Sequence, residues 1–116
     1  MKELLQELIS DRDALFMAGG DNSCFWGWFD PDLSEVGLED GWVTLSNGGY
    51  RFQFSLFPIT DIMLVKRPMA ACGGLPYSVQ FLDGCNSPQF SFFLKSDIAR
   101  DGVPYSEKIR ACSMRR

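Results

Sequence analysis

The most regular alternation of hydrophobic and polar positions lies in the second half of the chain. Tyr77–Leu82 and Gln89–Lys95 carry apolar side chains at every second position, and residues 83–88 between them are rich in turn formers. A period of two with aromatic and β-branched residues is typical of a β-hairpin with one buried face. The short apolar run Ile62–Val65, which Pro68 ends, predicts a strand covered on both faces. We therefore expect three adjacent antiparallel strands here.

A second hairpin is predicted upstream. Trp42–Ser46 and Tyr50–Leu56 alternate in the same way, and Asn47-Gly48 between them is the strongest short-range signal for a tight hairpin turn. Successive side chains of a strand point to opposite faces. In the second of these segments, the core-facing residues are Tyr50, Phe52, Phe54 and Leu56, and the residues that face away are Arg51, Gln53 and Ser55.

Cys24–Phe29 is the most aromatic window of the chain. In a strand, Trp26 and Trp28 share one face and the two phenylalanines share the other. Gly27 between the tryptophans marks a bulge or a close approach of the backbone. The chain holds 10 Phe, 3 Trp and 3 Tyr. Two interpretations of this richness stay open, an aromatic β-core and a pocket for a flat ligand.

Helical structure is predicted at both ends of the chain. Residues 1–18 predict an amphipathic helix, because Leu4, Leu8 and Leu15 form one apolar stripe and acidic residues populate the other side. Gly19-Gly20 would end this helix. Residues 96–116 predict a short helix or a frayed tail.

Together these elements predict an α+β fold in a single domain, residues 1–116. A curved antiparallel sheet of about six strands would span residues 24–95, with the N-terminal amphipathic helix packed across it.

Charge argues against nucleic acid and membrane partners. The 15 acidic and 11 basic residues give a net charge of -4, whereas phosphate binding needs a basic surface. The polar side of the N-terminal helix is acidic, which disfavours anionic lipid. No apolar run approaches the roughly 20 residues that span a bilayer.

Histidine is absent from the sequence. This absence excludes the Ser-His-Asp triad, Cys-His nucleophiles and His-bound zinc. The four cysteines lack the paired spacing of a zinc site, so we expect no metal site. A non-enzymatic protein is favoured, while catalysis by two carboxylates from the acidic segment 30–40 stays an alternative. The charged N-terminus lacks the apolar region of a signal peptide, so we expect a cytoplasmic protein with reduced thiols.

Three motifs of the central stretch together resemble a known family. They are Ile62-x-Leu64-Val65-x-Arg67-Pro68, Tyr77-Ser78-Val79-Gln80-Phe81-x-Asp83 and Phe90-x-Phe92-x-Leu94-x-Ser96-Asp97. Their order resembles the haem-utilisation family of HemS, ChuX and HutX type. The resemblance implies a curved antiparallel fold, often dimeric or built as two pseudo-repeats, that carries or degrades haem in the cytoplasm. The histidines with which that family contacts haem have no counterpart here.

The resemblance implies a site for haem or a related tetrapyrrole. Aromatic side chains suit a flat apolar ligand, and cations suit its propionates. The candidate binding residues are three aromatic wall residues and three cationic anchors: Trp26, Trp28, Phe52, Arg51, Lys66 and Arg67. Without histidine, the haem iron would be met by Cys72 as a thiolate, with Tyr50 and Tyr77 as weaker candidates, or would lack a protein ligand.

An alternative function stays open, a ligand-free module for protein–protein interaction or assembly on the same fold. An exposed patch of Trp26 and Trp28 would then form the interface, for example in a homodimer.

Overall fold

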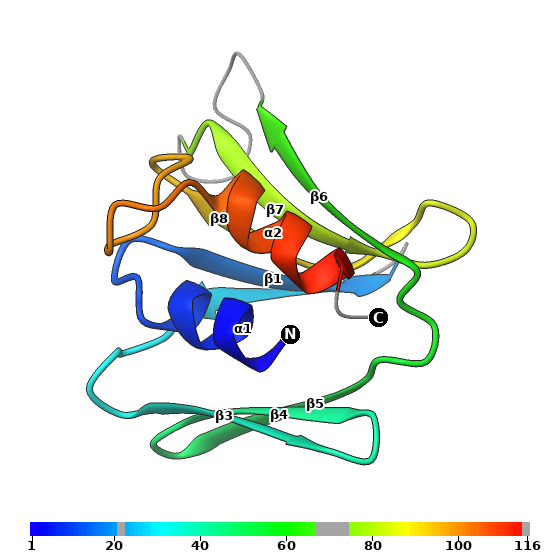
Figure 1. Ribbon diagram of the computed structural model, residues 1–116. Coiled ribbons are helices and arrows are strands. Elements are labelled where there is room, and N and C mark those ends of the chain that lie inside the picture. Colours follow the sequence, from blue (N-terminus) through cyan, green and yellow to red (C-terminus); the bar gives the residue numbers. More distant parts are fainter. Residues whose placement is uncertain (21–22, 67–74, 115–116) are drawn as a thin grey trace.

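The computed structural model describes residues 1–20, 23–66 and 75–114 (Figure 1). In these ranges the chain forms two helices and eight strands, and all paired strands are antiparallel. In chain order the elements are α1 (Lys2–Ile9), β1 (Leu15–Gly20), β2 (Ser23–Trp28), β3 (Ser34–Glu39), β4 (Trp42–Asn47), β5 (Tyr50–Ser55), β6 (Asp61–Lys66), β7 (Tyr77–Leu82), β8 (Pro88–Leu94) and α2 (Tyr105–Met114).

The strands form two sheets that lie in two layers (Figure 1). The large sheet has the order β2-β1-β8-β7-β6, and the small sheet has the order β3-β4-β5. The mostly antiparallel α+β class is confirmed, but the expectation of a single sheet of about six strands is wrong. The two sheets bury apolar faces against each other.

The helix predicted over residues 1–18 is also wrong in its length, because α1 ends at Ile9 and the following segment forms β1. The Ser10 hydroxyl donates to a backbone carbonyl one turn back at 2.6 Å, at the end of the helix. Leu15 and Phe16 are neighbours in β1 and are both buried, so they point into opposite faces of the large sheet. A strand buried on both faces shows no alternation of apolar and polar residues. The apolar residues of β1 happen to continue the helical spacing of the residues before them, so the predicted helix was too long.

Both hairpins predicted from alternation are confirmed. β6, β7 and β8 are neighbours in the large sheet, and β4 and β5 are joined by a tight turn. The expectation that Ile62–Val65 is covered on both faces is wrong, because β6 is an edge strand and Met63 is exposed. Asn47 pairs with Tyr50 across this turn, and Gly48 has a φ of 61°, a backbone conformation that glycine adopts without strain. As expected, Phe52 and Phe54 of β5 pack against the core.

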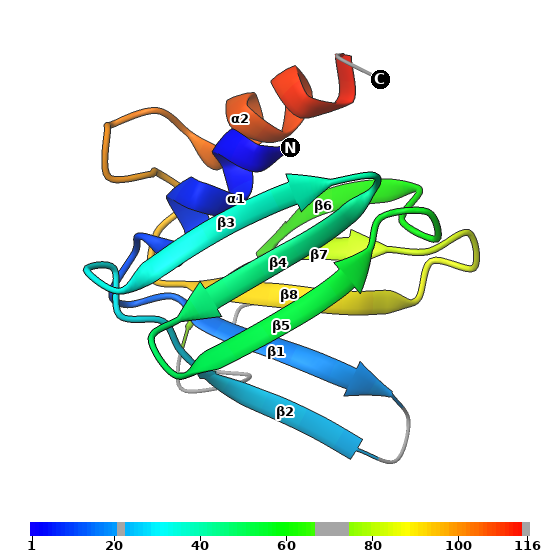
Figure 2. The same ribbon diagram turned by 90° about the horizontal axis from the view of Figure 1, so that it is seen from below.

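The core between the sheets is rich in phenylalanine. The ring of Phe16 on β1 lies 5.2 Å from that of Phe92 in its own sheet and 5.7 Å from that of Phe54 in the small sheet. α1 packs against β3 and α2 against β6, so the helices close one side of the two layers (Figures 1 and 2). On the other side the edge strands β2 and β5 carry no helix in the described ranges (Figure 2). The candidate site lies on this open side.

The C-terminal segment, expected as a short helix or a frayed tail, contains the helix α2. Tyr105 at its start is fully buried in the core. Neither α1 nor α2 is long and apolar enough to cross a membrane.

Candidate functional site

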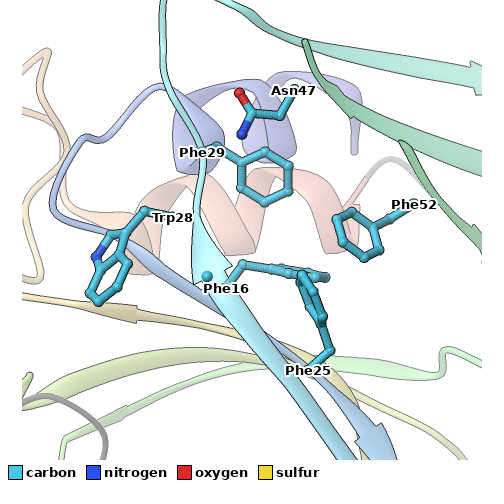
Figure 3. A pocket seen from close by; sticks show the side chains of 7 residues that line it. Phe16, Phe25, Trp28, Phe29, Asn47 and Phe52 are labelled. Atoms are coloured by element: carbon cyan, nitrogen blue, oxygen red, sulfur yellow. The ribbon is translucent and has the colours of Figure 1, made fainter. Parts of the chain in front are cut away.

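A cavity of about 240 Å³ opens between the edge strands β2 and β5 (Figure 3). Its lining comes from β1, β2, β5, the end of β4 and the residue after β2, and is mostly aromatic. The lining residues are Phe16, Phe25, Gly27, Trp28, Phe29, Asn47 and Phe52.

The phenylalanine rings of the cavity link the two sheets at their open edges. Phe25 of β2 and Phe52 of β5 have ring centroids 4.7 Å apart. Phe16 lies behind them, 5.5 Å from Phe52 and 5.4 Å from Phe29. Phe16 and Phe29 are buried, whereas Phe25 is 47% exposed. The cavity therefore has a buried aromatic floor and a half-exposed aromatic rim.

Asn47 supplies the polar side chain of the lining, and its oxygen is already engaged. Asn47 Oδ1 accepts hydrogen bonds from the Asp30 N–H at 3.1 Å and from the Ser34 hydroxyl at 3.3 Å. These bonds tie the segment after β2 to the end of β4. The lining residues include no ionisable side chain, so the site offers apolar surface and ring faces rather than charge or acid–base chemistry.

Trp26 and Trp28 lie on the opposite face of β2 from Phe25. They pair with Met17 and Leu15 of β1 on the outer face of the large sheet. Their rings meet edge to face at 6.0 Å, and they are 57% and 53% exposed. Trp28 also borders the cavity, and Figure 3 shows it on the other side of the strand from the phenylalanine rings. On the same face, Leu15, Leu75 and Phe93 form a small buried apolar cluster.

The predicted cationic anchors with described positions lie elsewhere. Arg51 alternates with Phe52 along β5, so the two side chains point to opposite faces of the small sheet. Lys66 is at the end of β6, where its Nζ lies 5.8 Å from the centroid of the Tyr77 ring. β6 and β2 are opposite edges of the large sheet, four strand spacings or about 19 Å apart. Of the predicted residues, Trp28 and Phe52 line the cavity, with Trp26 beside them, while Arg51 and Lys66 do not.

Arg67 and Cys72 lie outside the described residues, and so does the side chain of Tyr50. Tyr77 is partly buried against the main core, at the β6 side of the large sheet. The propionate role of Arg67 and the iron-ligand role of Cys72 stay predictions from the sequence.

Sequence reasoning missed five of the lining residues as site residues, among them Asn47, which it assigned only to the hairpin turn. Phe16 was missed because the helix predicted over residues 1–18 included it. Phe25, Gly27 and Phe29 share the face of β2 opposite to the tryptophans, and alternation within the aromatic window was the signal that could have found them.

Haem fits this lining only in part. The aromatic walls suit a flat apolar ring. However, the lining has no Cys, Met, Tyr or His side chain for iron and no cation for propionates. Its volume of about 240 Å³ is also below the roughly 300–1,000 Å³ of sites that enclose a drug-sized ligand. The cavity therefore offers aromatic surface of the kind that suits a flat ring, but its lining offers no side chain that ligates iron.

No protein-family model and no curated protein match the chain. Among the solved structures that match it in fold are two structures of ChuX. One, described as a crystal structure of ChuX, has a TM-score of 0.59 and 16% identity, over 97% of this chain and 68% of the other. The second, described as the haem-binding protein ChuX, has a TM-score of 0.59 and 17% identity, over 98% of this chain and 72% of the other. The chain therefore has a ChuX-like fold, as the resemblance of its central motifs implied.

Proposed function

We propose that this protein binds a flat, largely apolar ring ligand at the open edge between β2 and β5, and that the ligand is haem or a related tetrapyrrole. The aromatic cavity carries the proposal, because five aromatic side chains border it where no helix of the described ranges covers the sheets. The ligand class follows from the likeness in fold to a protein described as haem-binding.

The ring is recognised through its faces and edge. One edge enters the cavity, where it contacts Phe25 and Phe52, and the remainder lies over the exposed rim beside Trp28. Aromatic pairs contribute roughly 0.5–1.5 kcal/mol each beyond the area they bury. Recognition of this kind does not depend on iron, so haem and iron-free porphyrin are expected to bind with similar affinity.

The proposed role is binding without catalysis, in the cytoplasm. The lining presents no acid–base pair, and general acid–base chemistry needs such groups at the reacting atoms. If the iron is ligated, Cys72 is the candidate thiolate. A Cys72→Ala variant that keeps the Soret position of the haem complex would contradict that assignment without affecting recognition of the ring.

Titration of the purified protein with ferric haem, and separately with iron-free protoporphyrin, tests the proposed function. Absorption and tryptophan fluorescence should change saturably at one equivalent. Phe25→Ala should weaken binding at least about tenfold, because Phe25 forms the half-exposed rim. Phe57→Ala is the matched control, since Phe57 is 79% exposed and not part of the lining. No saturable change with either pigment, or equal affinities of wild type and Phe25→Ala, would contradict the proposal.

A second candidate function, assembly through β2, rests on a different observation. Two half-exposed tryptophans lie side by side on this edge strand, and exposed aromatic residues on an edge strand are typical of interfaces. We expect a homodimer in sedimentation velocity that Trp26→Ser with Trp28→Ser converts to monomer. A wild-type monomer at all concentrations would contradict this candidate.

A further inference from the structure

Gly27 occupies a special place in the cavity wall. It lies on the inward face of β2 and pairs with Phe16 of β1, which in turn pairs with Phe92 of β8 and through it with Val79 of β7. The positions that follow Gly27 in this inward row carry the buried apolar side chains of Phe16, Phe92 and Val79. Gly27 is therefore a gap at the end of the row, and the cavity opens at this gap.

The gap is not imposed by the backbone or by crowding. Gly27 is not among the glycines with positive φ, so other residues can adopt its conformation. A Cβ at this position would meet no atom closer than the Phe25 ring at 4.0 Å, an ordinary van der Waals contact. Glycine in a strand interior weakens the strand. Here the missing side chain leaves room for a ligand next to the cavity.

The chemistry of the lining limits what can enter through this gap. Asn47 is the polar side chain of the lining, and its oxygen is bonded to Asp30 and Ser34. The Asn47 amide N–H2 can donate to a carboxylate oxygen, but it carries no charge. A carboxylate taken out of water beside aromatic rings and this one neutral amide, without a cation, is strongly disfavoured. The part of the ligand that enters must therefore be free of carboxylates.

We propose that Gly27 is a specificity-determining residue that admits the carboxylate-free edge of a tetrapyrrole, while the carboxylates of the ligand remain in solvent. This inference rests on the proposed function. It selects porphyrins of the protoporphyrin type, whose two propionates lie on one edge and whose opposite edge bears methyl and vinyl groups. It excludes porphyrins of the uroporphyrin type, which carry carboxylates on all four pyrroles.

The test compares protoporphyrin IX with uroporphyrin in tryptophan-fluorescence titrations of the wild-type chain. Protoporphyrin IX should bind at least about tenfold more tightly. Gly27→Leu should weaken protoporphyrin binding by a similar factor, because the new side chain fills the cavity. Gly37→Leu is the matched control: Gly37 is also on an edge strand, it does not line this cavity, and its Cβ would lie 3.7 Å from the nearest atom.

The outcomes separate the two proposals. If wild type binds neither porphyrin, the proposed function fails, and this inference fails with it. If protoporphyrin IX binds but uroporphyrin binds equally, or Gly27→Leu binds protoporphyrin IX like wild type, this inference is overturned and the proposed function stands. If circular dichroism shows that Gly27→Leu does not fold, the comparison of the two porphyrins on the wild-type chain decides.

Discussion

Tyr105 carries a buried hydroxyl with no hydrogen-bond partner among the described residues. Its ring packs in the main core, and none of its surface is exposed. A buried hydroxyl without a partner loses its hydration and gains nothing in return. Tyr105→Phe should therefore be as stable as wild type, or more stable by about 1 kcal/mol. Urea unfolding at neutral pH measures this, and a loss of stability would show that the hydroxyl has a partner in solution.

The same residue predicts a dependence on alkaline pH. Burial raises the pKa of Tyr105 above its usual value, and the nearby charges of Asp11 and Glu7 raise it further. The unfolded chain loses this proton at about pH 10, whereas the folded chain keeps it. The contribution to stability is complete below about pH 10 and falls as the pH rises beyond it. Tyr105→Phe lacks this loss, so its advantage in urea midpoint over wild type should widen above about pH 10; parallel pH profiles would contradict the assignment.

At the scale of elements, the turn between β3 and β4 depends on a glycine. Asp40 and Gly41 have φ values of 52° and 78°, the pattern of a tight hairpin turn with an Asp-Gly pair. A Cβ at Gly41 would also lie 3.1 Å from Cε2 of Phe57. Gly41→Ala should lower the free energy of unfolding by about 1–2 kcal/mol. The measurement is urea denaturation.

Gly49→Ala is the matched control for this turn. A Cβ at Gly49 would meet no atom within 4 Å, and its φ is not positive. Its effect should stay within about 0.5 kcal/mol. Equal losses in the two variants would contradict the importance of the left-handed conformation at Gly41.

Elements with a strong local signal were predictable from the sequence, and elements without one were not. The turn after Asn47 and the alternation in β5, β7 and β8 specify hairpins locally. β1 has no such signal, because Leu15 and Phe16 are buried on opposite faces and no period of two results. The division into two sheets was not predictable either, because it depends on pairing between strands that are far apart in the sequence.

The candidate site was predictable to a similar extent. Aromatic composition pointed to Trp28 and Phe52, which line the cavity. Phe16 escaped because its element was misassigned. Arg51 and Lys66 lie away from the cavity because face and strand order decide their position, and strand order cannot be read from local pattern. Periodicity along one strand therefore helps to identify the site residues on that strand. It does not identify residues that distant strands bring to the same site.

At the scale of the whole molecule, Phe90 joins the two sheets. Its ring is stacked between Phe81 of the large sheet, at 4.3 Å, and Phe54 of the small sheet, at 4.5 Å. It is almost fully buried, so removal leaves a cavity where the layers meet. Phe90→Ala should cost about 3–5 kcal/mol of unfolding free energy, measured by urea or thermal denaturation.

The control for Phe90 is Phe57→Ala, because Phe57 is exposed and its truncation should change stability by no more than about 0.5 kcal/mol. If Phe90→Ala were as mild as Phe57→Ala, the two sheets would not share one cooperative core.

The proposed function requires that a flat ring binds at the open edge between β2 and β5. The three tryptophans allow a direct test, because Trp26 and Trp28 are on β2 and Trp42 is on β4 of the small sheet and does not line the cavity. A ¹H–¹⁵N spectrum resolves their indole N–H signals, and protoporphyrin IX is added stepwise. A ring bound there should shift the Trp28 signal and the backbone amides of Gly27 and Phe52 saturably, while the Trp42 signal stays in place. Shifts centred on Trp42, or no saturable shift at β2 and β5, would overturn the proposed function.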